Sequence, residues 1–236
     1  MPKIICNHAE FYYELHGQGH PLILIAGYTC DHTFWFPLLT QLKKRFRVLI
    51  FDNRWVGQTK DAGKDLSIKL MAEDVMALAH ALELQAPHIV GHSMGSYIAQ
   101  SVALHYGAQI GKWGLLGASP KLRLAALKAL KSHVLLREQG ADFQILCEVS
   151  IPWFFGEFFL SDEQNIEKAK RLMLDNPHPQ TLADQKRQLQ ALEDFQGMEN
   201  LQTTSSSVFI GCGSEDLIAS LVNHNFWPTR FLMQNL

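Results

Sequence analysis

Short apolar runs recur through the first half of the chain, and between them apolar residues return every three or four positions. The runs are PLILIAG at 21–27, RVLIFDN at 47–53, PHIVGHS at 87–93 and GKWGLLGAS at 111–119. Such uninterrupted runs are typical of strands buried on both faces. The clearest helical stripe contains Met71, Val75, Leu78, Ala79 and Leu82. This alternation predicts an α/β fold, a mostly parallel sheet with helices on both faces.

The ends and the middle of the chain break this alternation. KIICN and EFYYELHG at the start predict an antiparallel hairpin that leads into the sheet. From Pro120 to about Asn200 the pattern is helical without strands, and SSSVFIGCG at 205–213 returns to strand character. We therefore predict an α/β core formed by residues 1–119 and 201–236, with a helical cap at 120–200.

Composition narrows the class of protein. A length of 236 residues is typical of one α/β domain. Hydrophobic residues make up 47% of the chain and charged residues 19%, which is unlike the composition of a disordered protein. A formal net charge of −2 provides no basic field for phosphates. We therefore expect a small, roughly neutral, apolar ligand and no nucleic-acid partner. No apolar run approaches the roughly 18 residues needed to cross a bilayer.

The spacing of the cysteines and the N-terminal segment indicate the cellular compartment of the protein. Cys6, Cys30, Cys147 and Cys212 lie far apart and form no C-x-x-C pair. The opening MPKIICNHAE lacks the charged and then apolar pattern of a signal peptide. We expect reduced thiols and a cytoplasmic protein. The sequence shows no cluster of metal ligands, and nothing cationic beside Cys30 favours a reactive thiolate.

The stretch HIVGHSMGSYIAQ places a serine between a buried strand and a helix. Small residues precede and follow Ser93 by two positions, at Gly91 and Gly95. A G-x-S-x-G elbow of this kind exposes the serine as a nucleophile and directs free helix amides towards it. An ordinary strand-to-helix turn is the alternative. His92 adjoins the serine in a tight turn and points away from it, so we expect His92 to be a packing residue.

Further segments resemble the α/β-hydrolase superfamily from about residue 10 to 236. LILIAGYTCDHTFW is similar to the family's strand and oxyanion loop, with Ala26 where a histidine often precedes Gly27. FDNRWVGQT is similar to the D-x-R-G-x-G-x-S segment, with Trp55 in place of a glycine. MAEDVMALAHAL looks like the helix before the elbow. Together with GHSMGSYIAQ, these segments favour the enol-lactonase and carboxylesterase branch.

The resemblance implies a reaction and its residues. The backbone amides of Tyr28 and Met94 would form the oxyanion hole, and Asp216 matches the family's acid after VFIGCGSED. Two alternatives stay open: Tyr28 as a loop aromatic at the pocket wall, and Asp216 as a helix cap. Serine at position 93 argues against dehalogenases and epoxide hydrolases, which attack with a carboxylate. An acyl-serine intermediate without a cofactor is expected.

A histidine that could act as the general base is harder to find. After its acid the family has a helix, a strand and a loop that carries Gly-His. Here IASLVNHNF predicts the helix and RFLMQNL the strand, at which the sequence ends. His224 falls in the predicted helix and His32 near the oxyanion loop, and both are weak candidates. His105, His133 and His178 read as surface or packing residues.

We therefore expect a C-terminally shortened hydrolase whose last strand is uncovered, which favours self-association. The predicted activity is hydrolysis of a small carboxylic ester, lactone or thioester through Ser93. One alternative is a catalytically inactive protein that only binds small molecules. A mononucleotide-binding protein is disfavoured, because neither G-x-G-x-x-G nor G-x-x-x-x-G-K follows an early strand.

Two segments of the predicted cap have alternative interpretations. SPKLRLAALKALKSHVLLRE at 119–138 is basic and amphipathic, which fits a lid helix better than a membrane-surface helix. IPWFFGEFFL supplies five aromatic residues for an apolar acyl pocket or for the packing of the cap itself: Trp153, Phe154, Phe155, Phe158 and Phe159.

Overall fold

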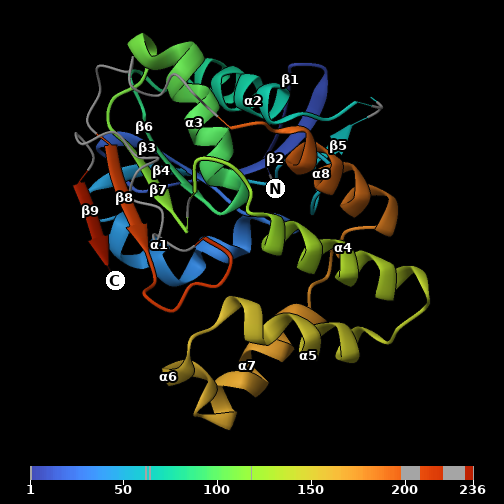
Figure 1. Ribbon diagram of the computed structural model, residues 1–236. Helices are drawn as coiled ribbons and strands as arrows, with labels where there is room; N and C mark the ends of the chain where they lie inside the picture. Colours follow the sequence, from blue (N-terminus) through green and yellow to red (C-terminus); the bar gives the residue numbers. More distant parts are fainter. Residues whose placement is uncertain are drawn as a thin grey trace.

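The computed structural model describes residues 2–61, 63, 65–117, 119–197, 208–219 and 232–235, the last four as backbone only. Its strands form one sheet in the order β1-β2-β4-β3-β6-β7-β8-β9, with β5 paired to β2 (Figure 1). From β3 to β9 every neighbouring pair is parallel. The strands are β1 (Lys3–Cys6), β2 (Ala9–His16), β3 (His20–Ile25), β4 (Phe46–Phe51), β5 (Lys60–Asp61), β6 (His88–His92), β7 (Trp113–Leu116), β8 (Val208–Cys212) and β9 (Leu232–Asn235).

The predicted strands and the N-terminal hairpin are confirmed. Antiparallel pairing of β1 with β2 runs from Lys3 opposite Tyr12 to Cys6 opposite Ala9. The apolar runs form the central strands because each is covered by helices on both sides. Ile23, Leu49 and Ile89 are fully buried on neighbouring strands. Burial of one such side chain contributes about 1.5–3 kcal/mol to folding.

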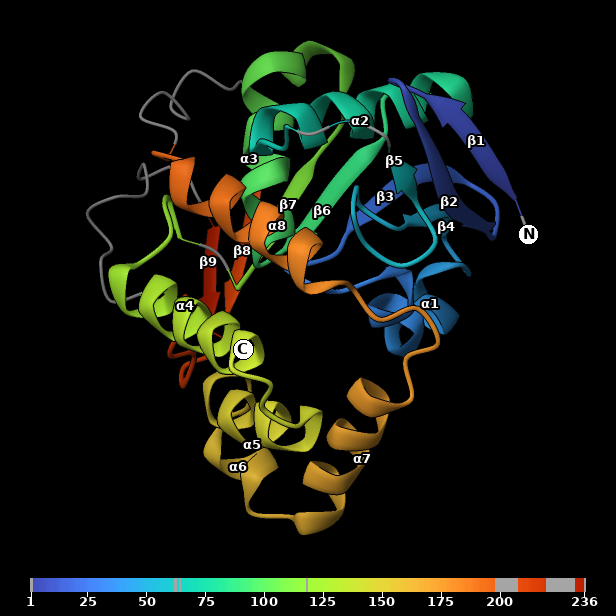
Figure 2. The ribbon, with the colours of Figure 1, turned by 90° about the vertical axis from the view of Figure 1, so that its right-hand side faces the viewer.

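Helices cover the two faces of the sheet (Figure 2). One face carries α2 (Ile68–Ala81) and α3 (Met94–Tyr106), and the other carries η1 (His32–Trp35) and α1 (Phe36–Leu42). Ser67 begins α2 because its hydroxyl accepts the amide of Leu70 at 3.0 Å. Of the predicted α2 stripe, Met71, Val75, Leu78 and Ala79 are buried and Leu82 is partly buried. A short η2 (Gly107–Gln109) follows α3.

The segment predicted to be helical without strands forms five helices, α4 (Leu124–Glu138), α5 (Phe143–Phe154), α6 (Glu157–Leu160), α7 (Glu163–Leu174) and α8 (Leu182–Asp194). Helices α5, α6 and α7 stand away from the sheet, at the end towards which β7 and β8 point (Figure 1). Helix α8 returns to the sheet, since Ala191 and Leu192 belong to the main apolar cluster. The boundaries of the core and the cap stay a prediction. Among the described helices, none is long and apolar enough to cross a membrane.

A buried arginine ties the loop after β4 to α2. Arg54 donates from Nε and Nη2 to the two carboxylate oxygens of Asp74, at 2.6 and 2.7 Å, and from Nη1 to Asp61 at 2.8 Å. Nη2 also bonds the carbonyl of Asn7. Burial disfavours the charged form of Arg54. The hydrogen bonds and charges of Asp74 and Asp61 outweigh this effect and raise the pKa of Arg54 above its usual value. The ion pair between Arg54 and Asp74 therefore fixes the loop that follows β4.

Replacing Arg54 with Ala should lower the free energy of unfolding by about 3–5 kcal/mol, because the buried carboxyl group of Asp74 would lose its cation and keep only the side-chain hydrogen bond from Asn7. Chemical denaturation measures this, with the exposed Arg45→Ala as the matched control. Adding Asp74→Asn to Arg54→Ala should restore part of the loss. Equal, small effects of Arg54→Ala and Arg45→Ala would contradict the buried ion pair.

Candidate active site

The turn between β6 and α3 holds Ser93 in a strained conformation. Its φ of 51° and ψ of −117° lie outside the regions that a serine normally occupies. A Cβ added to Gly91 would lie 2.0 Å from the carbonyl oxygen of Gly95, and one added to Gly95 would lie 2.1 Å from that of Ile25. Only glycine fits at these two positions. The Ser93 side chain makes no capping hydrogen bond to α3, so its hydroxyl is not committed to the helix.

The loop after β3 runs beside this turn. A Cβ added to Gly27 would lie 3.2 Å from the Cβ of Ser93, which places the backbone of the loop against the serine. Tyr28 follows Gly27, and its hydroxyl donates to the carbonyl of Gln185 in α8 at 3.2 Å. Met94 is fully buried at the first position of α3. Across the described residues, the amides of Tyr28 and Met94 donate no hydrogen bond.

Asp216 follows β8 at the same end of the sheet. Its Oδ1 accepts the amides of Ile218 and Ala219 at 2.8 and 2.7 Å, so the carboxylate closes a turn. A Cβ added to Gly117, just after β7, would lie 3.5 Å from both Asp216 Oδ2 and His92 Nε2. The carboxyl ends of β6, β7 and β8 thus bring Asp216 close to the elbow. The predicted helix from Ile218 begins as a turn, and the rest of it, including His224, lies outside the described residues.

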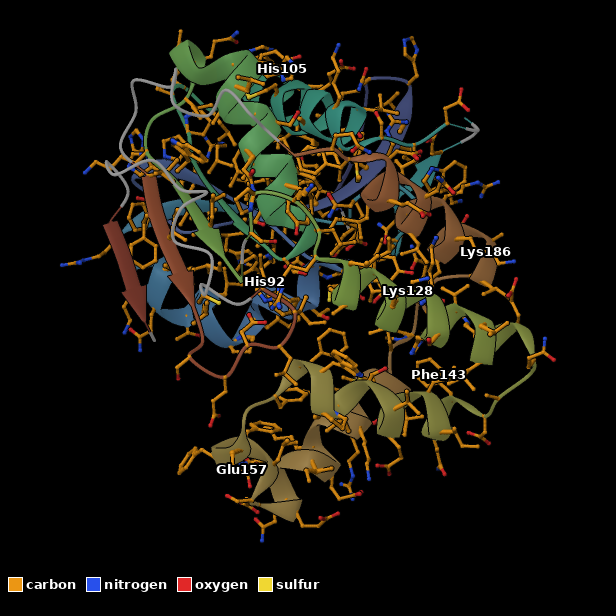
Figure 3. The ribbon with its side chains drawn as sticks, in the orientation of Figure 1. His92, His105, Lys128, Phe143, Glu157 and Lys186 are labelled. Atoms are coloured by element: carbon orange, nitrogen blue, oxygen red, sulfur yellow. The ribbon has the colours of Figure 1, made fainter. Side chains whose placement is uncertain are left out.

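His92 lies at the end of the sheet that faces the cap (Figure 3). Its ring stacks on Phe34 with the centroids 4.6 Å apart, as expected of a packing residue. The Nδ1 atom is buried and lacks a hydrogen-bond partner among the described residues. Burial lowers the pKa of His92 to about 4, although the charge of Asp216 opposes the shift. His92 is therefore neutral at pH 7.

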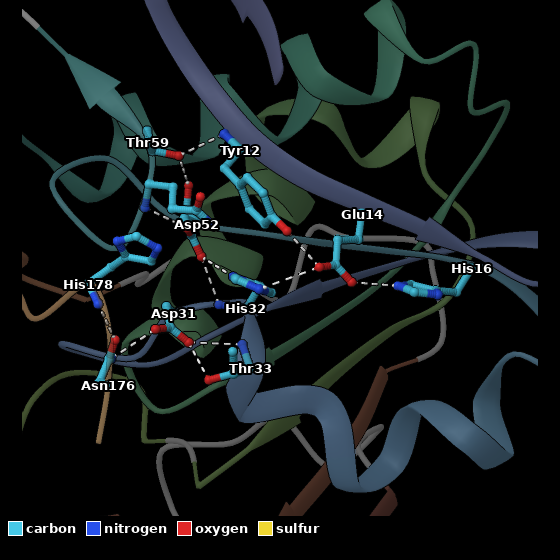
Figure 4. A network of polar contacts seen from close by, with 11 residues as sticks. Tyr12, Glu14, His16, Asp31, His32, Thr33, Asp52, Thr59, Asn176 and His178 are labelled. Atoms are coloured by element: carbon cyan, nitrogen blue, oxygen red, sulfur yellow. Dashed lines mark hydrogen bonds and ion pairs between the residues drawn. The ribbon is translucent and has the colours of Figure 1, made fainter. Parts of the chain in front are cut away.

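A second histidine, His32, belongs to a polar network that also contains Tyr12, Glu14 and Asp52 (Figure 4). Asp52 Oδ1 accepts both the backbone amide of His32, at 2.9 Å, and its Nδ1, at 2.7 Å. The other ring nitrogen lies 3.5 Å from Glu14 Oε1. Burial opposes protonation of His32, but its hydrogen bond to Asp52 and the nearby carboxylates outweigh burial and raise its pKa. Both ring nitrogens face carboxylates, which leaves neither for Ser93.

Three potential metal-ligand atoms lie within 4.8 Å of one another, one each from Asp31, His32 and Asp52. The sequence did not reveal this group, because Asp52 lies far from the other two along the chain. Hydrogen bonds within the protein already occupy it. Asp31 Oδ1 accepts the amide of Thr33 at 2.9 Å, and Oδ2 accepts Asn176 Nδ2 at 2.9 Å. These hydrogen bonds therefore hold η1 to the sheet through Asp52, and to the segment before α8 through Asn176.

The remaining predicted histidines lie elsewhere. His105 Nδ1 contacts the carbonyl of Ser101 at 2.8 Å within α3, and His133 Nδ1 contacts Ser150 Oγ at 2.9 Å between α4 and α5. His178 donates its backbone amide to Asn176 at 2.8 Å. In the described parts of the chain, no histidine forms a hydrogen bond with Ser93 or Asp216. In the described structure, no disulfide joins any two of the four cysteines.

The neutral state of His92 predicts an acid-sensitive fold. The unfolded chain protonates His92 near its ordinary pKa of 6.5, whereas the folded protein does so only near a pKa of about 4. Stability is therefore lost as the pH falls from about 6.5 to about 4, by about 3 kcal/mol from this residue. In denaturation series across this range, His92→Phe should remove that part of the loss. Parallel curves for the two proteins would show that His92 is not buried as a neutral ring.

Comparison with known proteins finds hydrolases among those with similar sequences. A protein named "Putative carbamate hydrolase RutD" from Azorhizobium caulinodans is 34% identical over 107 residues, which cover 44% of this chain and 39% of that relative. The 3-oxoadipate enol-lactonase 1 of Acinetobacter baylyi is 24% identical over 196 residues, 83% of this chain and 71% of the relative. The chain thus spans less than half of the first relative in that match.

Solved structures share the fold across nearly the whole chain. The enol-lactonase from Burkholderia xenovorans has a TM-score of 0.83 at 18% identity and covers 99% of this chain and 91% of its own. Residues 20–181 match the family described as alpha/beta hydrolase fold, and these residues hold the elbow, the loop after β3 and most of the helical segment. The chain belongs to the alpha/beta hydrolase fold family.

Proposed function

We propose that the protein is a serine hydrolase that attacks a small carboxylic ester, lactone, thioester or carbamate through Ser93. The oxygen of Ser93 forms a bond to the substrate carbonyl carbon, the bond from that carbon to the leaving group breaks to give an acyl-serine, and the hydroxyl proton passes through solvent to the leaving group. The amides of Tyr28 and Met94 stabilise the oxyanion of the tetrahedral intermediate. The observation that carries the proposal is the strained Ser93, held at φ 51° beside the uncommitted amides of the loop and helix.

We assign Asp216 as the acid that would orient an imidazole and stabilise its charged form. Its position after β8, near the elbow, supports this role. Its Oδ1 is engaged by two turn amides, whereas Oδ2, which accepts the Cys212 thiol at 3.5 Å, lies on the side of Gly117 and His92. The described residues offer no imidazole to that oxygen by a hydrogen bond, so we propose that they supply no effective general base and that His224, which lies outside them, does not take this role.

The relatives and the cap support the substrate class. Relatives are named for carbamate and enol-lactone hydrolysis, and both reactions begin with attack on an acyl carbonyl. Glu215 Oε2 accepts the amide of Glu157 at 2.9 Å, which holds the start of α6 beside the acid loop. Phe155 and Phe159 stack there with the centroids 4.1 Å apart. We assign this pair to the apolar wall for the acyl group.

A fluorophosphonate probe tests the nucleophile. Ser93 should be the one residue labelled, because the elbow exposes its hydroxyl beside an oxyanion site. Peptide mass mapping locates the label, and Ser93→Ala should abolish it. Ser132→Ala, which removes an exposed serine of α4, is the control and should label normally. Labelling that survives Ser93→Ala would exclude Ser93 as the nucleophile.

A p-nitrophenyl ester tests the missing base. We expect a slow release of about one equivalent of p-nitrophenol, because the activated leaving group needs no protonation but the Ser93 hydroxyl loses its proton to water unaided. Turnover should then be about a millionfold below that of a complete triad. Ordinary turnover of about 1–1000 per second that His224→Ala abolishes would contradict a missing base. No burst and no labelling would favour the alternative, a protein that only binds such molecules.

A further inference from the structure

The loop after β3 makes an unusual turn where it passes Ser93. The carbonyl of Gly27 accepts the amide of Cys30 at 3.2 Å, so residues 27–30 form a four-residue turn. Thr29 occupies the third position of this turn with a φ of 63°. A positive φ at this position favours glycine or asparagine, and it is an outlier for a β-branched residue. A contact from outside the turn must therefore hold Thr29 in this conformation.

That contact comes from Gln188 in α8. Gln188 is fully buried, and its Oε1 accepts the amide of Thr29 at 3.1 Å. Its Nε2 donates to the carbonyl of Arg54 at 3.4 Å, so both ends of the side-chain amide are engaged. The side chain of Arg54 is itself fixed by its ion pair with Asp74. Gln188 therefore cannot leave the turn without exposing buried polar groups that have no other partner to take its place.

The conformation of this turn sets the direction of the Tyr28 amide. Tyr28 lies at the second position of the turn, directly before Thr29, and its amide is one of the two that we assign to the oxyanion hole. If Thr29 changed to a negative φ, the peptide group between the two residues would rotate and the backbone of Tyr28 would shift with it. Helix α8 also holds the other end of Tyr28, whose hydroxyl donates to the carbonyl of Gln185 at 3.2 Å.

We infer that Gln188 is a positioning residue, which keeps Thr29 at a positive φ and so aims the amide of Tyr28 at the oxyanion formed on Ser93. This inference rests on the proposed hydrolysis. Without the acceptor on Gln188, the turn loses the contact that favours its strained form. The effect falls on the tetrahedral intermediate, because only there does the oxygen carry the charge that the amide stabilises. Binding of a carbonyl compound that has not reacted should change little.

Gln188→Met removes both hydrogen bonds at nearly constant volume, and butyl trifluoromethyl ketone measures the effect. The oxygen of Ser93 forms a bond to the ketone carbon, and the hydroxyl proton passes through solvent to the ketone oxygen, which gives a hemiketal. Its oxygen lies where the oxyanion would lie, and the equilibrium amount of hemiketal does not depend on a general base. ¹⁹F NMR should show affinity about 10- to 100-fold weaker in Gln188→Met, because one donor is displaced.

Three controls separate positioning from general damage. Gln185→Met should bind the ketone as the wild-type protein does, since Gln185 is also buried in α8 but its side chain accepts from Arg137 at 2.8 Å and not from the turn. Gln188→Glu keeps an oxygen that can accept the amide of Thr29, so it should recover most of the lost affinity. Butyl methyl ketone scarcely forms a hemiketal, and it should compete equally well for the wild-type protein and Gln188→Met.

Equal affinity of the wild-type protein and Gln188→Met for the trifluoromethyl ketone would overturn the role of Gln188 and leave the proposed hydrolysis standing. An equal loss in Gln185→Met would do the same. If the wild-type protein and Ser93→Ala gave identical spectra, with no hemiketal in either, the proposed hydrolysis would fall and the role of Gln188 with it. Should Gln188→Met not fold, Gln188→Asn replaces it, because its amide is one methylene too short to reach both partners.

Discussion

The close approach of three backbone segments at the elbow is the constraint on which the rest of the site depends. Gly91 and Gly95 leave no room for a side chain, and Gly27 brings the loop after β3 against Ser93. The cost of holding Ser93 in an unfavourable φ and ψ is of the order of 1–3 kcal/mol. The free energy gained by burying strands β3, β6 and β7 offsets this cost, because the apolar contacts of these strands fix both ends of the turn.

Hydrogen bonds and ion pairs of buried charged side chains fix the loops that surround the elbow. The Asp52 carboxylate holds η1 through His32, and Arg54 holds the next turn of the chain to α2 through Asp74. Helix α8 completes the arrangement, since Gln188 accepts the amide of Thr29 at 3.1 Å. The loop that lies against Ser93 is thus held from the sheet side and from the helical segment. The loop and the elbow are therefore held in one arrangement by the fold itself.

The sequence predicted the features that depend on local pattern. Apolar runs identified the central strands, and the glycines around Ser93 identified the elbow. Contacts between distant residues were not predictable: the His32–Asp52 pair and the effect of Asp216 on His92 arise only where strands meet. The sequence marked Trp55 as a departure from the family, but its left-handed backbone and its contact with Arg187 depend on where α8 returns to the sheet.

The central claim is that the elbow makes Ser93 a nucleophile whether or not a base completes the triad. The most direct test is the intact mass of the protein after prolonged incubation with p-nitrophenyl acetate, followed by peptide mapping. The account predicts a stable gain of one acetyl group, confined to the peptide that contains Ser93 and lost in Ser93→Ala. An unchanged mass, or acetylation at the same level in Ser93→Ala, would contradict it.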